Sequence, residues 1–138
     1  MAIGYTQWHP CLTKSQESVL TFTGANGLPT DGNFTQGVFI GDCSAAGVLA
    51  WNATSPILGT ADVRVWLQFD NSSGVWHLAS WLGTGGTINL NAATPGKSGL
   101  FRVDTYGAQR LYVQALNFAA GATTVKAIVR GGTGNGTI

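Results

Sequence analysis

The sequence has 138 residues, of which seven are Lys or Arg and six are Asp or Glu, so the formal net charge is +1. This length suits one domain, yet only 9% of the residues are charged, against about 25% in an ordinary soluble domain. The near-neutral balance excludes a protein that holds nucleic acid on a basic surface. No apolar run approaches the roughly 20 residues of a membrane span.

The first ten residues predict an arm, because Ile3, Tyr5 and Trp8 are large side chains without a strand-length partner nearby in the sequence. A first edge strand of the same domain is the equally weighted alternative. We place the arm at residues 1–10, one domain at 11–130, and a Gly-rich tail, flexible in isolation, at 131–138.

From residue 19 onward, apolar residues alternate with polar ones, which is the period of a half-buried β-strand. Clusters of turn-forming residues separate these stretches about every 8–12 residues, as in sandwiches and barrels. The sequence therefore predicts an all-β fold, an antiparallel β-sandwich of jelly-roll type. The expected strands are 19–23, 36–40, 48–53, 63–69, 75–82, 87–91, 100–105, 110–117 and 123–129.

Matching of apolar faces predicts three hairpins, because a slip of one residue would move core side chains into water. They join 62–70 to 75–82, 100–105 to 110–117, and 110–117 to 123–129. A chain that wraps between two sheets is the alternative for the last two. In order, the hairpins pair Phe69 with Trp76, Arg102 with Tyr112, and Val113 with Ala127.

The first hairpin has an unusual outward face. It carries Arg64, Trp66 and Gln68 on one strand and His77 and Trp81 on the other. Aromatic and Arg side chains are the usual anchors of protein interfaces, so these residues predict burial by a neighbouring subunit. The full set of candidate partner-binding residues is Ile3, Tyr5, Trp8, Arg64, Trp66, Gln68, His77, Trp81, Arg102 and Tyr112.

Cys11 and Cys43 could close a loop through a disulfide, but two reduced, buried thiols are favoured, because no secretion signal is visible. Two cysteines are also too few for a structural zinc site unless both histidines join them. We expect no metal and no cofactor.

Residues 99–132, GLFRVDTYGAQRLYVQALNFAAGATTVKAIVRGG, resemble a module of tailed-bacteriophage virion proteins. In that module a Gly-hydrophobe start leads into an Arg-Val-Asp strand, a short turn, a second Arg-containing strand, a Gly turn and a final strand. Residues 63–80, VRVWLQFDNSSGVWHLAS, are similar to the strand–turn–Trp element that often precedes it. The resemblance implies a virion structural protein of β-sandwich type, either a capsid decoration (cement) protein or a domain of a tail or fibre. A chain that starts at Met1 favours the decoration type.

Two other classes compete with this interpretation. Catalysis is not expected, because the sequence has no Gly-x-Ser-x-Gly elbow and no recognisable pair of catalytic carboxylates. A carbohydrate-binding module would use Trp66 and Trp81 as a stacking platform, with Arg64, Gln68 and His77 as hydrogen-bond partners.

The sequence thus predicts a non-enzymatic protein of the virion, assembled in the host cytoplasm, that lies on the outer surface of an icosahedral phage capsid. As a homotrimer it would bind the major capsid protein and bridge neighbouring subunits, with no nucleic-acid or membrane partner. A tail or fibre adhesin that binds a host surface glycan is the alternative.

Overall fold

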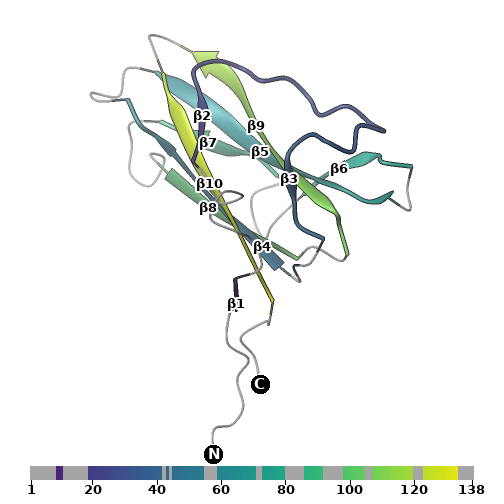
Figure 1. Ribbon diagram of the computed structural model, residues 1–138. Helices are drawn as coiled ribbons and strands as arrows, with labels where there is room; N and C mark the ends of the chain where they lie inside the picture. Colours follow the sequence, from purple (N-terminus) through teal and green to yellow (C-terminus); the bar gives the residue numbers. More distant parts are fainter. Residues whose placement is uncertain are drawn as a thin grey trace, which may run out of the picture.

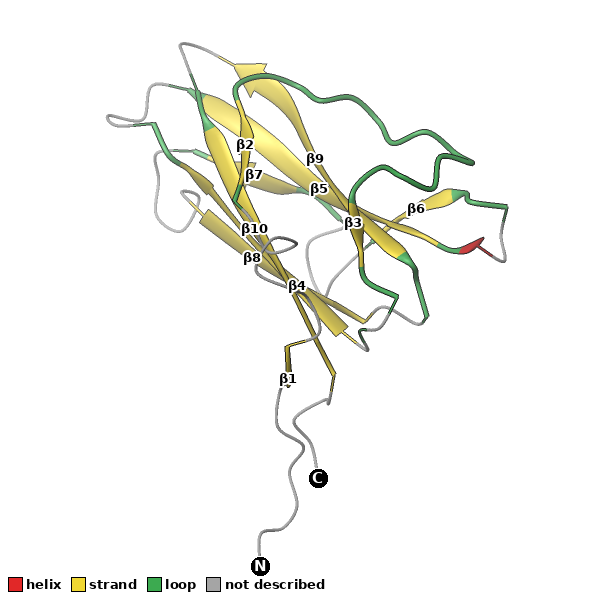
Figure 2. Cartoon of the chain, in the orientation of Figure 1, coloured by secondary structure: helices red, strands yellow, loops and turns green. Residues whose placement is uncertain are grey.

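The computed structural model describes residues 9–10, 19–41, 43, 45–54, 59–70, 73–79, 86–91, 98–104, 107–119 and 123–133. That part of the chain is built from strands and the loops between them, apart from one 3₁₀-helical residue, Asp70 (Figure 2). It has no helix long and apolar enough to cross a membrane. The strands are β1 (His9–Pro10), β2 (Leu20–Phe22), β3 (Val38–Phe39), β4 (Ala45–Asn52), β5 (Thr60–Gln68), β6 (Trp76–Leu78), β7 (Ile88–Leu90), β8 (Ser98–Asp104), β9 (Arg110–Ala119) and β10 (Val125–Thr133).

The strands form two antiparallel sheets that pack as two layers (Figure 1). Sheet A has the order β1-β10-β4-β8, and β2 also pairs with β10. Sheet B has the order β3-β9-β5-β6, and β7 also pairs with β5. The expectation of an all-β sandwich is therefore confirmed.

The inward side chains of both sheets form one core, because successive residues of a strand point to opposite faces. In β5, for example, Ala61, Val63 and Val65 are fully buried, and Leu67 is 7% exposed. The matching residues of the other long strands are Val48 and Ala50 of β4, Leu111 and Val113 of β9, and Val125, Ala127 and Val129 of β10.

The last two expected hairpins are wrong. β8 pairs with β4 in sheet A, β9 pairs with β5 in sheet B, and β10 returns to sheet A. A turn between two sheets keeps the same alternation of buried and exposed residues as a hairpin, so face matching alone selects the wrong partner. Arg102 pairs with Gly47 instead of Tyr112, and Tyr112 pairs with Trp66. Val113 pairs with Val65 instead of Ala127, and Ala127 pairs with Ala50.

The first expected hairpin, β5–β6, is present, but its register differs by one residue. Trp76 lies opposite Gln68 rather than Phe69. Ser73 and Gly74 both have positive φ, 59° and 73°, and the turn they form takes up one more residue than the expected four-residue loop. The shift moves Trp76 to the outward face of sheet B and His77 to the opposite face, where it lies across from Leu67.

The two ends of the described chain meet at the end of sheet A. His9 pairs with Thr133, and Pro10 pairs with Gly132. The end of the segment assigned to the arm thus forms β1, and the expected boundary at residue 131 falls inside β10. Residues 1–8 and 134–138 lie outside the described residues.

Cys43 is buried and disulfide-bonded, which corrects the expectation of a reduced thiol. That expectation rested on the cellular compartment, and the compartment does not determine which sulfur atoms the fold brings together. Cys11, the second cysteine of the chain, lies outside the described residues.

Candidate functional site

The outward face of sheet B is the surface at which the sequence predicts a partner. Arg64, Trp66 and Gln68 do share this face, because they alternate with the buried inward residues of β5. Tyr112 lies beside Trp66 on β9. Trp76, instead of His77, is the residue that β6 places beside Gln68.

Arg64 and Trp66, on this face, already make polar contacts within the chain. The Arg64 Nε donates a hydrogen bond to Thr87 Oγ1 over 2.9 Å. The Trp66 Nε1 donates to Gln114 Oε1 over 2.9 Å, and Trp66 is half-buried.

Of the remaining predicted residues that the structure describes, His77 and the backbone of Arg102 do not join this group. His77 is exposed and packs edge-on against Phe69, with ring centroids 5.7 Å apart. The backbone of Arg102 belongs to sheet A. Ile3, Tyr5, Trp8, Trp81 and the side chain of Arg102 lie outside the described residues.

A long loop covers the other part of the same face. We call residues 23–37, which connect β2 to β3 (Figure 1), the docked loop. Gln68 is completely buried, and its Nε2 donates hydrogen bonds to the carbonyl oxygens of Asn33 and Gly74, both over 2.8 Å. The Trp76 Nε1 donates to the Thr30 carbonyl oxygen over 3.0 Å.

Arg110 and Tyr112 hold the two ends of the docked loop. The Arg110 Nε donates to the Gln36 carbonyl oxygen over 2.6 Å, and its Nη2 donates to those of Thr35 and Gly37 over 3.2 and 2.9 Å. Burial lowers the pKa of Arg110 from its ordinary value. The Tyr112 hydroxyl lies 3.1 and 3.0 Å from the carbonyl oxygens of Asn26 and Gly27, to which it donates.

Asn26 takes the place of a strand beside β9. Its Nδ2 donates to the Val113 carbonyl oxygen over 2.9 Å, and its Oδ1 accepts from the Ala115 amide over 2.8 Å. Its own amide donates to the Ala115 carbonyl oxygen over 3.3 Å. The docked loop thus satisfies backbone groups that β3 is too short to reach.

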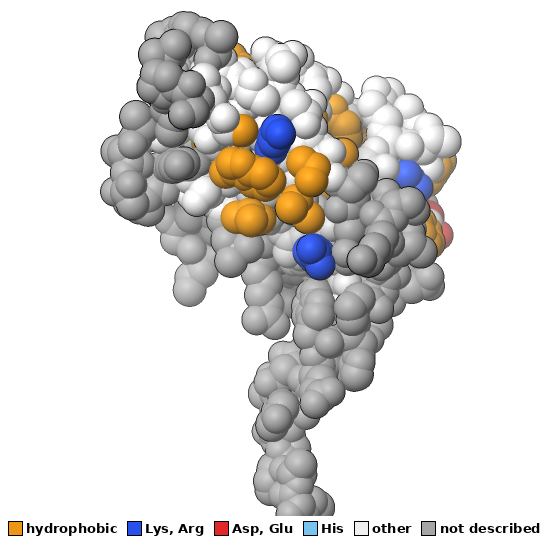
Figure 3. All heavy atoms as spheres, turned by 60° about the vertical axis from the view of Figure 1, so that its left-hand side comes forward, with side chains coloured by type: hydrophobic (Ala, Val, Ile, Leu, Met, Phe, Trp, Pro, Cys, Tyr) orange, Lys and Arg blue, Asp and Glu red, His pale blue; other side chains and the backbone are white. Residues whose placement is uncertain are grey.

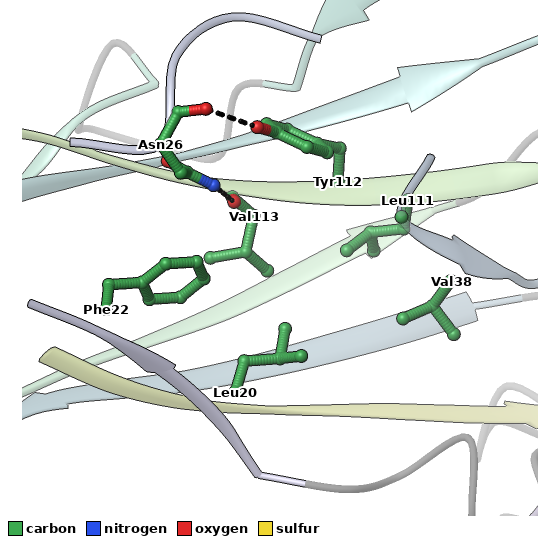
Figure 4. A pocket seen from close by; sticks show the side chains of 8 residues that line it. Leu20, Phe22, Asn26, Val38, Leu111, Tyr112 and Val113 are labelled. Carbon is green, nitrogen blue, oxygen red and sulfur yellow. Dashed lines mark hydrogen bonds between the residues drawn. The ribbon is translucent and has the colours of Figure 1, made fainter. Parts of the chain in front are cut away.

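An apolar cleft opens at the edge of the sandwich, beneath the start of the docked loop (Figure 4). It has a volume of about 230 Å³ and lies between Leu20 and Phe22 of β2 and Val38, Leu111 and Val113 of sheet B. The polar atoms of Asn26 and Tyr112 at this cleft are engaged in the contacts that hold the docked loop.

The outward face of sheet A is different, because a group of apolar side chains lies open on it. We call the set Thr21, Leu49, Trp51, Lys126, Ile128 and Arg130 the sheet A face. Leu49 is 40% exposed, while Trp51 and Ile128 are half-buried. Figure 3 shows apolar side chains gathered on one side of the molecule with basic side chains above and below them.

The register places these residues as direct neighbours. Leu49 lies opposite Ile128, and Trp51 lies opposite Lys126. Arg130 lies opposite Gly47, which has no side chain to cover it. The inward neighbours on both strands are core residues, so the backbone that presents this face is well supported.

Comparison with known proteins identifies no family. No protein-family model matches the chain, and no curated protein matches it. Among solved structures, the chain is similar to the SPBc2 prophage-derived protein YomS, with 12% identity, a TM-score of 0.39, and coverage of 81% of this chain and 93% of that one. It also matches a virus-like particle of the extra small virus of the giant freshwater prawn Macrobrachium rosenbergii, with 12% identity, a TM-score of 0.18, and coverage of 98% and 83%. TM-scores this low establish neither a shared fold nor a shared function.

Sequence reasoning missed the sheet A face. The signal is present in the pattern Val48-Leu49-Ala50-Trp51-Asn52, where a Leu and a Trp alternate with small buried residues. A second signal is Lys126-Ala127-Ile128-Val129-Arg130, in which both faces are partly apolar. Only the pairing of β4 with β10, in which Leu49 lies opposite Ile128, 79 residues further along the sequence, brings the two patterns together.

Among the described residues, no group of three or more His, Cys, Asp or Glu side chains is arranged to hold a metal ion. The sheet A face combines Trp51 and Arg130, two residue types that are enriched at protein interfaces, with Leu49, Ile128 and Lys126.

Proposed function

We propose that this chain is a non-enzymatic structural protein of a phage particle, which decorates the outer surface of the capsid and stabilises the shell by bridging neighbouring capsid subunits. The observation that carries the proposal is the open apolar group Leu49, Trp51 and Ile128 on the sheet A face. The sequence resemblance of residues 63–132 to phage virion modules supports the same class.

Two further features favour a protein that functions against a larger body. A charged fraction of 9% is far below the roughly 25–35% that keeps a free small domain soluble. The disulfide at Cys43 suits a protein that functions on the surface of a virion, because disulfides persist there and are rare in the cytosol. Assembly on the particle would cover the sheet A face.

The sheet A face suits this role better than sheet B. The docked loop covers the part of sheet B around Gln68 and Trp76. Gln68, one of the predicted contact residues, is fully buried beneath this loop. A partner could reach that region only by displacing a loop held by Gln68, Trp76, Arg110 and Tyr112. The sheet A face requires no such rearrangement.

The decisive experiment adds the purified chain back to phage shells assembled without it and measures bound protein by co-sedimentation. We expect saturable binding that Trp51→Ala weakens by roughly thirtyfold, as for an interface residue worth ~2 kcal/mol. Leu28→Ala is the matched control, because Leu28 is 63% exposed on the docked loop, away from the sheet A face. Its affinity should equal that of the wild type.

Failure of the wild-type chain to bind shells would contradict the proposal. Specific binding to a glycan array, together with no binding to shells, would instead support the adhesin of a tail or fibre.

We further propose that the chain assembles as a homotrimer at positions of three-fold symmetry. Each copy would then contribute one sheet A face, and three weak contacts would add up to strong attachment. Light scattering measures the mass of the free protein, and counting the bound copies per shell measures how many occupy each three-fold position. A monomeric mass in solution together with one copy per three-fold position would contradict the proposal.

A further inference from the structure

The outward face of sheet B carries a second group of accessible side chains, to which the docked loop makes no hydrogen bond. Asp62, Arg64 and Trp66 of β5 point outward and are half-buried, because they alternate with fully buried residues. Asn89 of β7 lies opposite Asp62, and Asn117 of β9 reaches the same carboxylate. We call Asp62, Arg64, Trp66, Asn89 and Asn117 the polar platform.

The two charged groups of the polar platform are held apart. The Asp62 carboxylate accepts a hydrogen bond from the Nδ2 of Asn89 and another from the Nδ2 of Asn117, each over 2.8 Å. The Arg64 Nε donates to Thr87 Oγ1, so both of its Nη groups keep their donors. The Cα atoms of Asp62 and Arg64 are ~7 Å apart along the strand. The platform therefore presents an acceptor and a donor as separate groups.

These contacts close the platform to an apolar partner, but hydrogen-bonding capacity remains on it. A carboxylate has about four lone-pair positions, and the two amides of Asn89 and Asn117 occupy only some of those on Asp62. Each amide keeps a second N–H, and both Asn side chains are exposed. A ligand that fits must offer groups that both donate and accept.

Trp66 adds an apolar surface beside these polar groups. Its Nε1 donates to Gln114 Oε1 over 2.9 Å, which fixes the orientation of the indole ring. Its neighbours across the sheet are Tyr112 on β9 and Leu78 on β6. A ring held in place next to a few fixed polar groups is typical of small-molecule binding sites.

The charge balance limits the class of ligand. Asp62 and Arg64 cancel each other, so an anion meets the carboxylate and a cation meets the guanidinium. The described side chains that flank the platform are uncharged: Thr87 beside β7, and Gln114 and Leu116 on β9. A neutral molecule with several hydroxyl groups and an apolar C–H face meets every one of these conditions.

We propose that the polar platform binds a neutral saccharide. The Trp66 ring contacts the C–H face of a sugar ring, Asp62 accepts hydrogen bonds from its hydroxyl groups, and the Arg64 Nη groups donate to them. Of the sugar contacts expected from the sequence, Trp66 and Arg64 remain. Gln68 is buried and His77 lies on the opposite face of the strand, and the carboxylate and amides of the platform take their place.

This site goes beyond the proposed function and does not depend on it. The two sheets are opposite layers of the sandwich (Figure 1). A copy attached through the sheet A face therefore presents the polar platform away from the shell, where a saccharide of the surroundings reaches it.

The test is calorimetric titration of the full chain with neutral oligosaccharides of glucose, galactose, mannose and N-acetylglucosamine, and with sialylated and sulfated oligosaccharides for comparison. We expect a neutral oligosaccharide to bind with the same affinity at low and high salt, because the platform has no net charge. Asp62→Asn and Arg64→Gln should each weaken binding at least roughly tenfold, the effect of one hydrogen bond to a charged group. Trp66→Ala should abolish it.

Trp51→Ala is the matched control, because it removes a half-buried Trp from the other sheet. It should bind the saccharide like the wild type, although it weakens attachment to shells. Thermal melting verifies that each variant folds. If Trp66→Ala does not fold, Asp62→Asn and Arg64→Gln, which keep similar side-chain volumes, decide the question.

Three results would overturn the inference: no neutral oligosaccharide binds the wild type, only charged oligosaccharides bind and salt weakens them, or Asp62→Asn and Arg64→Gln bind the neutral oligosaccharide as tightly as the wild type. In each case the proposed function stands, because co-sedimentation with shells measures it separately. If the wild type binds the neutral oligosaccharide through the platform but does not bind shells, the inference stands and the proposed function fails.

Discussion

Gln68 illustrates how far a single residue can depart from its place in the sequence pattern. It belongs to the outward row of β5, yet it is fully buried, because the docked loop lies on top of it. Its Nε2 donates to two backbone carbonyls, whereas its Oε1 has no hydrogen-bond partner. Alternation correctly predicted the direction of this side chain, but its burial depends on a loop more than 30 residues away.

Gln68→Met tests the contribution of those hydrogen bonds. The substitution keeps the volume similar and removes the hydrogen bond to the Asn33 carbonyl and one of the two that the Gly74 carbonyl accepts, the other coming from the Gly32 amide. We therefore expect the free energy of unfolding to fall by about 1–3 kcal/mol. Urea denaturation measures it. Gln109→Met is the control, because the side-chain amide of Gln109 donates to Asp70 at an exposed position. This variant should lose less than about 0.5 kcal/mol of unfolding free energy. Equal stability of wild type and Gln68→Met would show that the docked loop does not depend on this residue.

Tyr112 gives the fold a dependence on alkaline pH. Burial raises its pKa above the ordinary value of 10.0, so the unfolded chain releases this proton at a lower pH than the folded chain does. The folded state therefore binds more protons above pH 10, and stability falls as the pH rises through that range. Deprotonation also removes the donor that holds Asn26 and Gly27.

The measurement is the melting temperature of wild type and Tyr112→Phe between pH 8 and 11. The wild type should lose more stability than Tyr112→Phe above about pH 10, because only the wild type carries this shifted group. Parallel curves for the two proteins would mean that Tyr112 does not contribute.

At the scale of elements, the strands were predictable and their partners were not. Each of the nine expected strands has a counterpart, because alternation is local to the strand. Pairing depends on which sheet a turn leads to, and Gly107 has a positive φ of 82° in a turn that crosses from sheet A to sheet B. A glycine turn of this kind is equally compatible with a hairpin within one sheet. The sequence around Gly107 therefore does not distinguish a hairpin from a crossing between the two sheets.

The docked loop is the element that most needs a specific backbone conformation. Gly37 has a φ of +73°, and a Cβ added there would clash with the carbonyl group of Leu111. Gly27 has a φ of +79° but has nothing within 4 Å of an added Cβ. The two glycines therefore separate the cost of the left-handed conformation from the cost of the clash.

We expect Gly27→Ala to lose about 1 kcal/mol of stability, from the left-handed conformation alone. Gly37→Ala should lose about 2 kcal/mol or more, because the clash pushes the loop away from β9 and from the Arg110 guanidinium. Chemical denaturation of both variants gives the comparison. Equal losses would show that the close approach of Gly37 to Leu111 is relieved without cost.

At the scale of the whole molecule, the two outward faces of the sandwich have different roles. Sheet B is closed by the protein's own loop and by a polar network around Trp66 and Asp62. The sheet A face is where we propose that a partner binds. The sequence indicated a covered exterior from its low charge and predicted the contact on β5, because Trp66 and Arg64 are conspicuous within one strand; our proposal uses the sheet A face instead. Leu49, Trp51 and Ile128 become a surface only when β4 and β10 are paired.

This division of roles predicts that stability and shell attachment are separable. Leu49→Ala/Trp51→Ala removes side chains at partly exposed cross-strand positions, so we expect a loss of stability of no more than about 1 kcal/mol per residue, with attachment to shells abolished. Gln68→Met should do the reverse: it lowers stability, while the protein that remains folded at low temperature attaches with wild-type affinity. Melting curves and co-sedimentation on the same preparations test both. If Gln68→Met abolished attachment at a temperature where it is folded, the contact would involve the docked loop, and the assignment of the partner to the sheet A face would be wrong.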